Sequence, residues 1–264
     1  VNSGHGQSVV PAEVQIPIAT PPPPPVDLLP WNEARRKAVS TVEKLHYKEC
    51  LSLLAGDPRS NSPTPGFYTG VTPAISRLGI PSLKMQDASS GFRPSQHGER
   101  GTVTEFPALL ALAASWDSLT VSEVATAVAR EFRGKGANVL LGPGVNVNRV
   151  SKGGRNFEYI SGDDPYLGAI LASAYVKAVQ KQNVMAVVKH FAFNEQETNR
   201  GWVSAEVSEE TKWELYFQPF QAAISAGAGA VMCSYNRVSS TFACENEALL
   251  KGNLKDKMGF QGFV

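Results

Sequence analysis

Short apolar segments recur along this sequence, and most of them are separated by longer segments with helical periodicity. The apolar segments begin at positions 81, 107, 137, 183, 229 and 262. A strand, a helix and a second strand at this spacing predict parallel pairing, because parallel strands need a crossover connection between them. Near-continuous apolar strands also predict burial on both faces of the sheet. The chain is therefore expected to be an α/β protein.

Four segments outside these strands carry helix signals. Ser-x-x-Glu at 40–43 predicts a capping box for a helix that ends near Gly56, and Thr-x-x-Glu at 120–123 predicts one for a helix that ends by Gly136. A third helix is expected to begin at Pro165, with the two aspartates before it as structural caps, and a fourth helix at residue 208.

Polar residues follow several of the predicted strands directly. Asp87 follows the first strand, a glycine loop follows the third, Lys189 and His190 follow the fourth, and Tyr235 follows the fifth. A TIM-type (β/α) barrel gathers functional residues at the C-terminal ends of several strands. A doubly wound sheet would concentrate them at one switch point, usually with a Gly-rich phosphate loop. We therefore predict a TIM-type barrel, incomplete because the chain stops within the sixth predicted strand.

The first 30 residues lack both helical and strand periodicity, and they contain the segment "TPPPPPV". Consecutive prolines favour a stiff polyproline II conformation over a packed element. Residues 1–30 are thus predicted to be a Pro-rich tail or linker, and residues 31–264 to be the barrel domain. The sequence has neither the pattern of a signal peptide nor an apolar run of the roughly 18 to 20 residues that a membrane span requires.

The charges of the chain nearly cancel, with 25 Lys+Arg against 24 Asp+Glu. This balance gives no electrostatic reason to expect nucleic acid or an anionic membrane as a partner, whereas a neutral ligand fits it. Among the three cysteines, Cys50 stands alone, and Cys233 and Cys244 flank a ten-residue segment. A disulfide would close that segment in an oxidising compartment, and three reduced thiols are the alternative. We expect an extracellular protein.

The segment "KHFAFNEQETNR", at 189–200, is the densest group of hydrogen-bonding side chains in the sequence. Together with residues from other strand ends it can bind the hydroxyls of a polyol, because such ligands need many directed, charge-assisted hydrogen bonds. The candidate binding residues are Asp87, Arg155, Lys189, His190, Arg200 and Tyr235.

Three other types of site compete with this interpretation. His190 with Glu195 and Glu197 suggests a metal site, but the spacing matches no known ligand pattern and we expect no metal or cofactor. "LGPGVNVNR" contains Gly-x-Gly without the remaining residues of a dinucleotide or phosphate loop. Lys189 at a strand end is compatible with a Schiff-base lysine, as in barrel aldolases.

Four segments, in order, resemble signature blocks of the β-glucosidases of glycoside hydrolase family 3. They are "MQDASSGFR", "GPGVNVNR" with "GGRNFEYISGDDPYLG", "KHFAFNEQETNR" and "VMCSYNRVSSTFACEN". The resemblance covers residues 31–264. It implies a retaining glycosidase that releases terminal β-D-glucosyl residues from glucosides or oligosaccharides, with its glucosyl subsite at the mouth of a TIM-like barrel.

The resemblance also implies roles for individual residues. Asp87 would bind the hydroxyls of the terminal glucose, and Tyr235 would stand beside the nucleophile, with further contacts from Arg155, Lys189, His190 and Arg200. In the family the nucleophile follows "GF-x-GFV" within a few residues, and the acid/base comes from a later domain. Both catalytic carboxylates are therefore expected beyond Val264, and a non-catalytic sugar-binding barrel remains the alternative.

Overall fold

The computed structural model describes residues 28–56, 67–87, 89–94 and 101–264. Its main sheet has five strands in the order β1-β2-β3-β4-β6. β1 pairs with β2 in antiparallel fashion, and every other neighbouring pair is parallel. The strands are β1 Gly70–Val71, β2 Lys84–Gln86, β3 Val139–Leu140, β4 Met185–Phe191 and β6 Ala230–Cys233. Four of the predicted strands, β2, β3, β4 and β6, are thereby confirmed.

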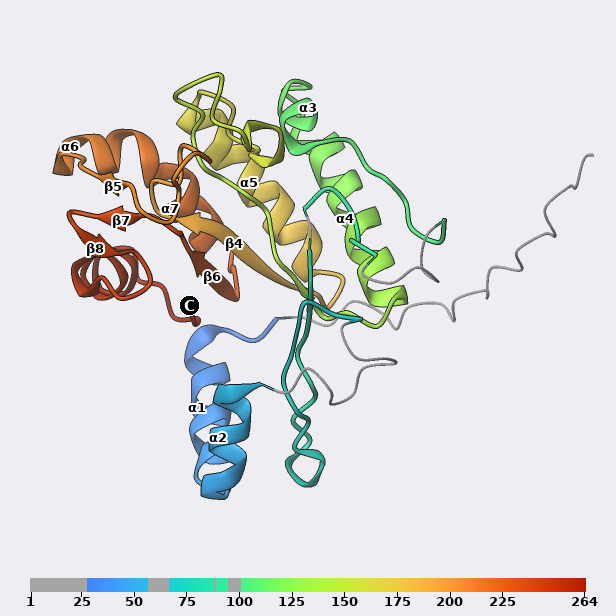
Figure 1. Cartoon of the computed structure of the whole chain (residues 1–264). Helices are drawn as coiled ribbons and strands as arrows, with labels where there is room; N and C mark the ends of the chain where they lie inside the picture. The colour runs from blue at the N-terminus through green and yellow to red at the C-terminus, as the bar shows by residue number, and fades with distance from the viewer. Residues whose placement is uncertain (1–27, 57–66, 88, 95–100) are drawn as a thin grey trace, which may run out of the picture.

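Three helices connect the parallel strands and cover one face of the sheet (Figure 1). They are α4 Ser118–Gly134, α5 Pro165–Gln180 and α7 Gln218–Ser225. Alternate strand residues such as Leu140, Val188 and Val231 belong to the core that these helices complete. The neighbouring positions on these strands, whose side chains point to the other face of the sheet, form a second apolar cluster made of Val139, Leu141, Val187 and Ala230. Because side chains alternate along a strand, the curled sheet has an outer layer against helices and a separate inner layer, as in a TIM-type barrel.

The first two helix predictions need correction at their caps. Residues 40–56 do not form one helix, because α1 (Trp31–Val42) and α2 (Tyr47–Ala55) are separated by a turn. The capping box that starts α2 is formed by His46 and Glu49 rather than by Ser40 and Glu43. For α4, the carboxylate of Asp117 accepts from the Leu119 amide and the Thr120 hydroxyl, so Asp117 and not Thr120 is the N-cap.

The other helix predictions are closer to the structure. Asp164 caps α5 by accepting from the amides of Tyr166 and Leu167, and Pro165 occupies the first turn, as expected. Ser208 is the N-cap of the next helical segment, also as expected. That segment is not continuous, and it consists of α6 Glu209–Thr211, the π-helical η4 Lys212–Tyr216 and α7.

The predicted strand at 107 is wrong, because Leu109–Ala113 form the short helix α3. Leu and Ala are strong helix formers, and the segment contains no β-branched residue. At the predicted sixth strand only Phe263 pairs, in an isolated parallel bridge with Ala230.

Several elements were not predicted. A second sheet, in the order β5-β7-β8, contains β5 Ser204–Ala205, β7 Arg237–Val238 and β8 Thr241–Phe242. The remaining helical turns are η1 Ser76–Leu78, η3 Asn156–Glu158 and η5 Ala248–Lys257. The predicted tail at 1–30 lies outside the described residues except for its last three. Of the helices in the described part of the chain, none has the length and apolar character to cross a membrane.

The packing of α5 onto the loop before it provides a stability prediction. A Cβ atom on Gly168 would lie 2.9 Å from the Cα of Ser161, whose side chain is buried and bonded to the Val145 carbonyl. Gly168→Ala should therefore destabilise the protein by about 1 to 3 kcal/mol in thermal or urea unfolding. Gly134→Ala is the matched control, because a Cβ there has nothing within 4 Å and helix propensity alone favours alanine by up to about 1 kcal/mol. Equal stability of the two variants would contradict this account of the packing.

Candidate functional site

The strand ends of the main sheet bring the predicted site residues together. Asp87 directly follows β2, Lys189 and His190 lie near the end of β4, and Tyr235 is two residues beyond β6. The register of β4 against β6 shifts between Lys189 and Phe191, so that His190 occupies a bulge. A bulge places an extra residue on one strand and re-aims its side chain. The sheet thereby presents two consecutive polar side chains at one position.

Lys189 is the centre of an ion-pair network. Its side chain is only 4% exposed, and its Nζ lies 3.4 Å from Glu158 Oε2 and 3.6 Å from Asp87 Oδ1. Arg155 donates from Nε to the other oxygen of Glu158, and Arg93 approaches the second oxygen of Asp87 at 3.9 Å. Two carboxylates from different loops thus stabilise one buried ammonium ion.

An aromatic ring joins the remaining predicted residues to this network. The guanidinium of Arg200 lies 4.0 Å from the centroid of the Tyr235 ring, and that of Arg155 lies 6.0 Å from it. The rings of Tyr235 and His190 are 5.9 Å apart. All six predicted binding residues therefore lie in one connected cluster, which we call the strand-end cluster: Asp87, Arg155, Lys189, His190, Arg200 and Tyr235. Tyr235 is 45% exposed, so the cluster reaches the surface.

Glu158 contacts the strand-end cluster but was not predicted as a site residue. It forms an ion pair with Arg155, three residues before it. The same carboxylate also reaches Lys189, which is 31 positions later and belongs to a different element. The sequence signal was an acidic residue in a segment that leaves the neighbouring strand, but local spacing alone does not disclose the second contact.

His190 is held at both its main chain and its ring. Asn146 accepts from the His190 amide at 2.7 Å and donates to its carbonyl at 3.2 Å. On the ring, Nδ1 is 3.0 Å from the hydroxyl of Tyr159, which in turn accepts from Asn194 at 3.1 Å. Burial, followed by the positive charges of Lys189, Arg155 and Arg200, lowers the pKa of His190 well below its usual value. The ring is therefore neutral at physiological pH.

Asn146, which bonds the main chain of His190, also bonds a carboxyl group. Glu195 accepts from the Asn146 amide at 3.1 Å. Burial raises the pKa of Glu195 to about 7, against the opposing effects of the Asn146 hydrogen bond and the charge of Arg149. Asn146 is therefore hydrogen-bonded both to the main chain of His190 and to a carboxyl group, that of Glu195, whose charge changes near neutral pH.

The chemistry of the cluster suits a neutral, hydroxyl-rich ligand. Carboxylates accept, ammonium and guanidinium groups donate, and an exposed aromatic ring offers an apolar face. Nη1 of Arg155 is buried and makes no hydrogen bond within the described ranges. Nζ of Lys189 is held between two carboxylates, at 3.4 and 3.6 Å, whereas a Schiff-base lysine must present its amine to a carbonyl carbon. Nowhere among the described residues do three or more His, Cys, Asp or Glu side chains gather closely enough to hold a metal ion.

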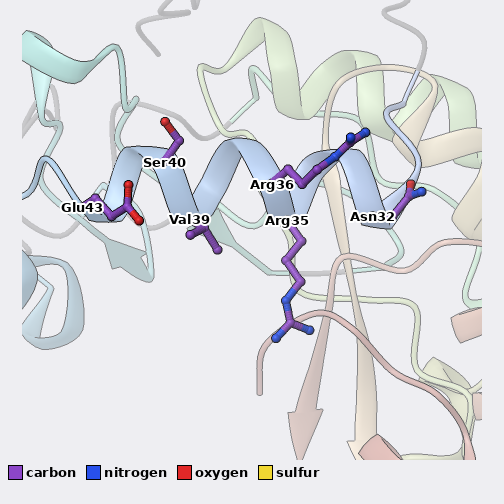
Figure 2. A pocket seen from close by; sticks show the side chains of 6 residues that line it. All are labelled: Asn32, Arg35, Arg36, Val39, Ser40 and Glu43. Atoms are coloured by element: carbon purple, nitrogen blue, oxygen red, sulfur yellow. The ribbon is translucent and has the colours of Figure 1, made fainter.

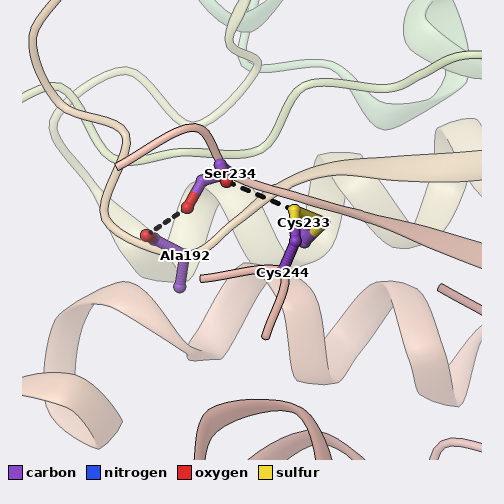
Figure 3. Close-up of a disulfide and its surroundings, with 4 residues drawn as sticks. All are labelled: Ala192, Cys233, Ser234 and Cys244. Atoms are coloured by element: carbon purple, nitrogen blue, oxygen red, sulfur yellow. Dashed lines mark hydrogen bonds between the residues drawn. A yellow bond between two sulfur atoms is a disulfide. The ribbon is translucent and has the colours of Figure 1, made fainter. Parts of the chain in front are cut away.

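A disulfide joins Cys233, at the end of β6, to Cys244, which follows β8 (Figure 3). Between Cys233 and Tyr235, the hydroxyl of Ser234 donates to the Ala192 carbonyl at 2.7 Å. The disulfide thus links the strand end that carries Tyr235 to the segment after β8, and the Ser234 hydrogen bond links it to the segment after His190. Cys50 is a free cysteine.

The pocket shown in Figure 2 lies elsewhere. Its lining consists of Asn32, Arg35, Arg36, Val39, Ser40 and Glu43, all from α1 or its C-cap. A groove formed along a single helix has no second wall of protein to enclose a ligand. We therefore assign the candidate site to the strand-end cluster.

Comparison with known proteins identifies relatives over most of the chain. A model described as the glycosyl hydrolase family 3 N terminal domain matches residues 68–264. The chain is 40% identical over 246 residues to a probable beta-glucosidase M of Emericella nidulans, covering 89% of this chain and 30% of the relative. It is 38% identical over 249 residues to beta-glucosidase 1 of Saccharomycopsis fibuligera, with 89% and 27% covered. The chain thus spans less than a third of the length of these relatives.

Solved structures of beta-glucosidases are also similar to this chain. DesR, a beta-glucosidase from Streptomyces venezuelae in complex with D-glucose, superposes with a TM-score of 0.78 at 35% identity, over 86% of this chain and 28% of that one. Beta-glucosidase 3B from Thermotoga neapolitana in complex with glucose also gives 0.78, at 36% identity, over 86% and 33%.

The ion-pair network predicts unequal consequences for two similar substitutions. Glu158→Gln removes a carboxylate that is buried between two cations, and it should lower the free energy of unfolding by about 3 to 5 kcal/mol. Glu197→Gln removes the corresponding partner of Arg200, also three residues away but 43% exposed, and it should cost less than about 1 kcal/mol. Urea denaturation of the two variants makes the comparison. Similar losses for both would show that Lys189 does not depend on Glu158.

Proposed function

Since this chain belongs to glycosyl hydrolase family 3, we propose that the strand-end cluster is the glucosyl subsite of a retaining β-glucosidase. The observation that carries the proposal is the convergence of Asp87, Lys189 and Arg155 with an exposed tyrosine at the C-terminal ends of parallel strands. The two solved relatives described above are complexes with glucose. The substrates would be β-D-glucosides and oligosaccharides with a terminal β-D-glucosyl residue, including those from cellulose degradation.

Each residue has a role in this proposal. Asp87 accepts from sugar hydroxyls, and Lys189 and Arg155 donate to them. His190 donates from the inner wall. Arg200 keeps the Tyr235 ring in place through their stacking contact. Cleavage with retention needs two carboxylates about 5 Å apart, and their location beyond Val264 remains a prediction.

The reaction itself gives the first test. The full-length protein should release glucose from the non-reducing end of a β-linked substrate, and NMR of the first-formed sugar should show the β-anomer, because a double displacement retains configuration. The α-anomer would contradict the mechanism. Tight binding of glucose without any hydrolysis would instead support a non-catalytic sugar-binding barrel.

Asp87 should be sensitive to loss of its charge. Hydrogen bonds from sugar hydroxyls to a charged group contribute about 1.5 to 3 kcal/mol each. Asp87→Asn in the full-length protein should therefore lower kcat/KM on an aryl β-glucoside by about tenfold to a hundredfold. Asp256→Asn is the control, since Asp256 is 57% exposed and pairs only with the exposed Lys251 within the described residues. If both variants kept the kinetics of the unsubstituted protein, the subsite would be assigned to the wrong residues.

We also propose that the protein is extracellular. The disulfide between Cys233 and Cys244 supports this location, because such bonds persist in oxidising compartments. Peptide mapping without reduction, on protein recovered from its natural source, should yield the two cysteines as one linked pair, and an alkylating reagent should label Cys50 alone among the three. Recovery of Cys233 and Cys244 as free thiols would count against secretion.

A further inference from the structure

The phenol of Tyr159, which is 2% exposed, lies against Nδ1 of the buried His190 ring. We propose that Tyr159 is a positioning residue that fixes the tautomer of His190, so that the ring carries its proton on Nε2 and donates from that atom to a ligand hydroxyl. The identity of the ligand rests on the proposed function, whereas the tautomer does not.

The direction of the hydrogen bonds determines the tautomer. Asn194 donates from its amide nitrogen to the phenol oxygen at 3.1 Å, which leaves the phenol's own proton free to be donated. Among the described residues the other hydrogen-bond partner of the phenol oxygen is Nδ1 of His190, at 3.0 Å, and we assign the phenol proton to this contact. A ring nitrogen that accepts a hydrogen bond carries no proton, so the neutral imidazole must be protonated at Nε2.

The surroundings keep the ring in this orientation. Tyr159 and His190 are 2% and 1% exposed, and their rings meet edge to face with centroids 5.9 Å apart. Asn146 bonds both main-chain polar groups of His190, which fixes the backbone from which the ring projects. Within the described part of the chain Nε2 makes no hydrogen bond, and the neighbouring ring on the site side is that of Tyr235.

The same surroundings keep the ring neutral. The charged and titratable groups that face it are Lys189, Arg155, Arg200, Tyr159 and Tyr235. Three of these are cations, and they add to burial in disfavouring the imidazolium ion. The titrating carboxyl of Glu195 bonds the side chain of Asn146 and is not among the groups that shift the pKa of the ring. The burial of Tyr159 also raises the pKa of its phenol above the usual value, so the phenol keeps the proton that it donates. His190 is therefore a fixed donor over the physiological range and does not exchange protons during the reaction.

The first experiment observes the ring directly. The full-length protein is labelled with ring-15N histidine, and the His190 signals are assigned by their loss in His190→Gln. The expected spectrum shows one neutral tautomer, protonated at Nε2, that does not change between about pH 5 and pH 8, the window in which an unperturbed histidine titrates. A proton on Nδ1, or titration within this window, would overturn the proposal.

Variants then test whether Tyr159 is the cause. Tyr159→Phe removes the donor to Nδ1, so the ring should become a mixture of tautomers, and kcat/KM on an aryl β-glucoside should fall about tenfold. Tyr175→Phe is the matched control, because Tyr175 is equally buried and its hydroxyl donates to the Ser89 carbonyl. In that variant the Nε2 proton should remain. An unchanged tautomer in Tyr159→Phe would overturn the role given to Tyr159.

A third variant reverses the direction of the hydrogen bonds that run from Asn194 through Tyr159 to His190. In Asn194→Asp, above the pKa of the new carboxyl, a carboxylate accepts the phenol proton, and the phenol oxygen must then accept from Nδ1–H. The His190 proton should therefore move from Nε2 to Nδ1, which no loss of stability would produce. If this variant kept the proton on Nε2, the proposed control of the His190 tautomer by Tyr159 would be refuted, even if Tyr159→Phe did not fold. If the unsubstituted full-length protein and its variants showed the expected tautomers but the unsubstituted protein did not hydrolyse β-glucosides, the proposed function would be overturned and this inference would stand.

Discussion

The charge of Lys189 is the constraint on which the arrangement of the strand ends depends. An ammonium ion with a side chain 4% exposed is costly unless carboxylates lie near it. One of these, Asp87, comes from the end of β2, and the other, Glu158, comes from the segment between β3 and α5. Because three successive parts of the barrel wall meet at one nitrogen atom, moving any one of them leaves a buried charge without its partner. The geometry of the candidate site and the stability of this edge of the sheet therefore have the same origin.

The bulge in β4 adds the second constraint. It places His190 beside Lys189, and the two residues need opposite treatment, since one must remain charged and the other neutral. The structure separates them by their partners: carboxylates surround Lys189, while amide and phenol groups surround His190. The carboxyl group of Glu195 bonds the side chain of Asn146, which in turn bonds the main chain of His190. A carboxylate in direct contact with the ring would favour the imidazolium ion, and its place one residue further away avoids that effect.

The sequence predicted the parallel strands and the residues at their ends better than it predicted the local elements. Four strands were found because short apolar runs that are bounded by polar residues, and separated by helical segments, leave few other structures. "PALLALAAS" was assigned to a strand because length and apolarity alone do not separate a buried strand from a short helix. The cap at Asp117 was missed because a Thr-x-x-Glu pattern three residues later also fits a helix start. Glu158, Tyr159 and Asn146 could not be assigned to the site, since their roles depend on contacts with residues more than 30 positions away.

The charges of the candidate site also bear on which ligands it accepts. Lys189 and Arg155 are matched by Asp87 and Glu158, and Arg200 is matched by Glu197. The formal charges of these six groups cancel, and the one further cation of the network, Arg93, has a side chain that is 73% exposed. An anionic ligand such as a phosphate ester would have to compete with carboxylates already in place, and a cation would have to displace an ammonium or guanidinium ion. A neutral polyol meets neither obstacle, because each hydroxyl can donate to a carboxylate oxygen and accept from a nitrogen of the same network. Selectivity then depends on the direction of individual hydrogen bonds, and a donor with a fixed tautomer at His190 contributes to it in a way that a titrating imidazole would not.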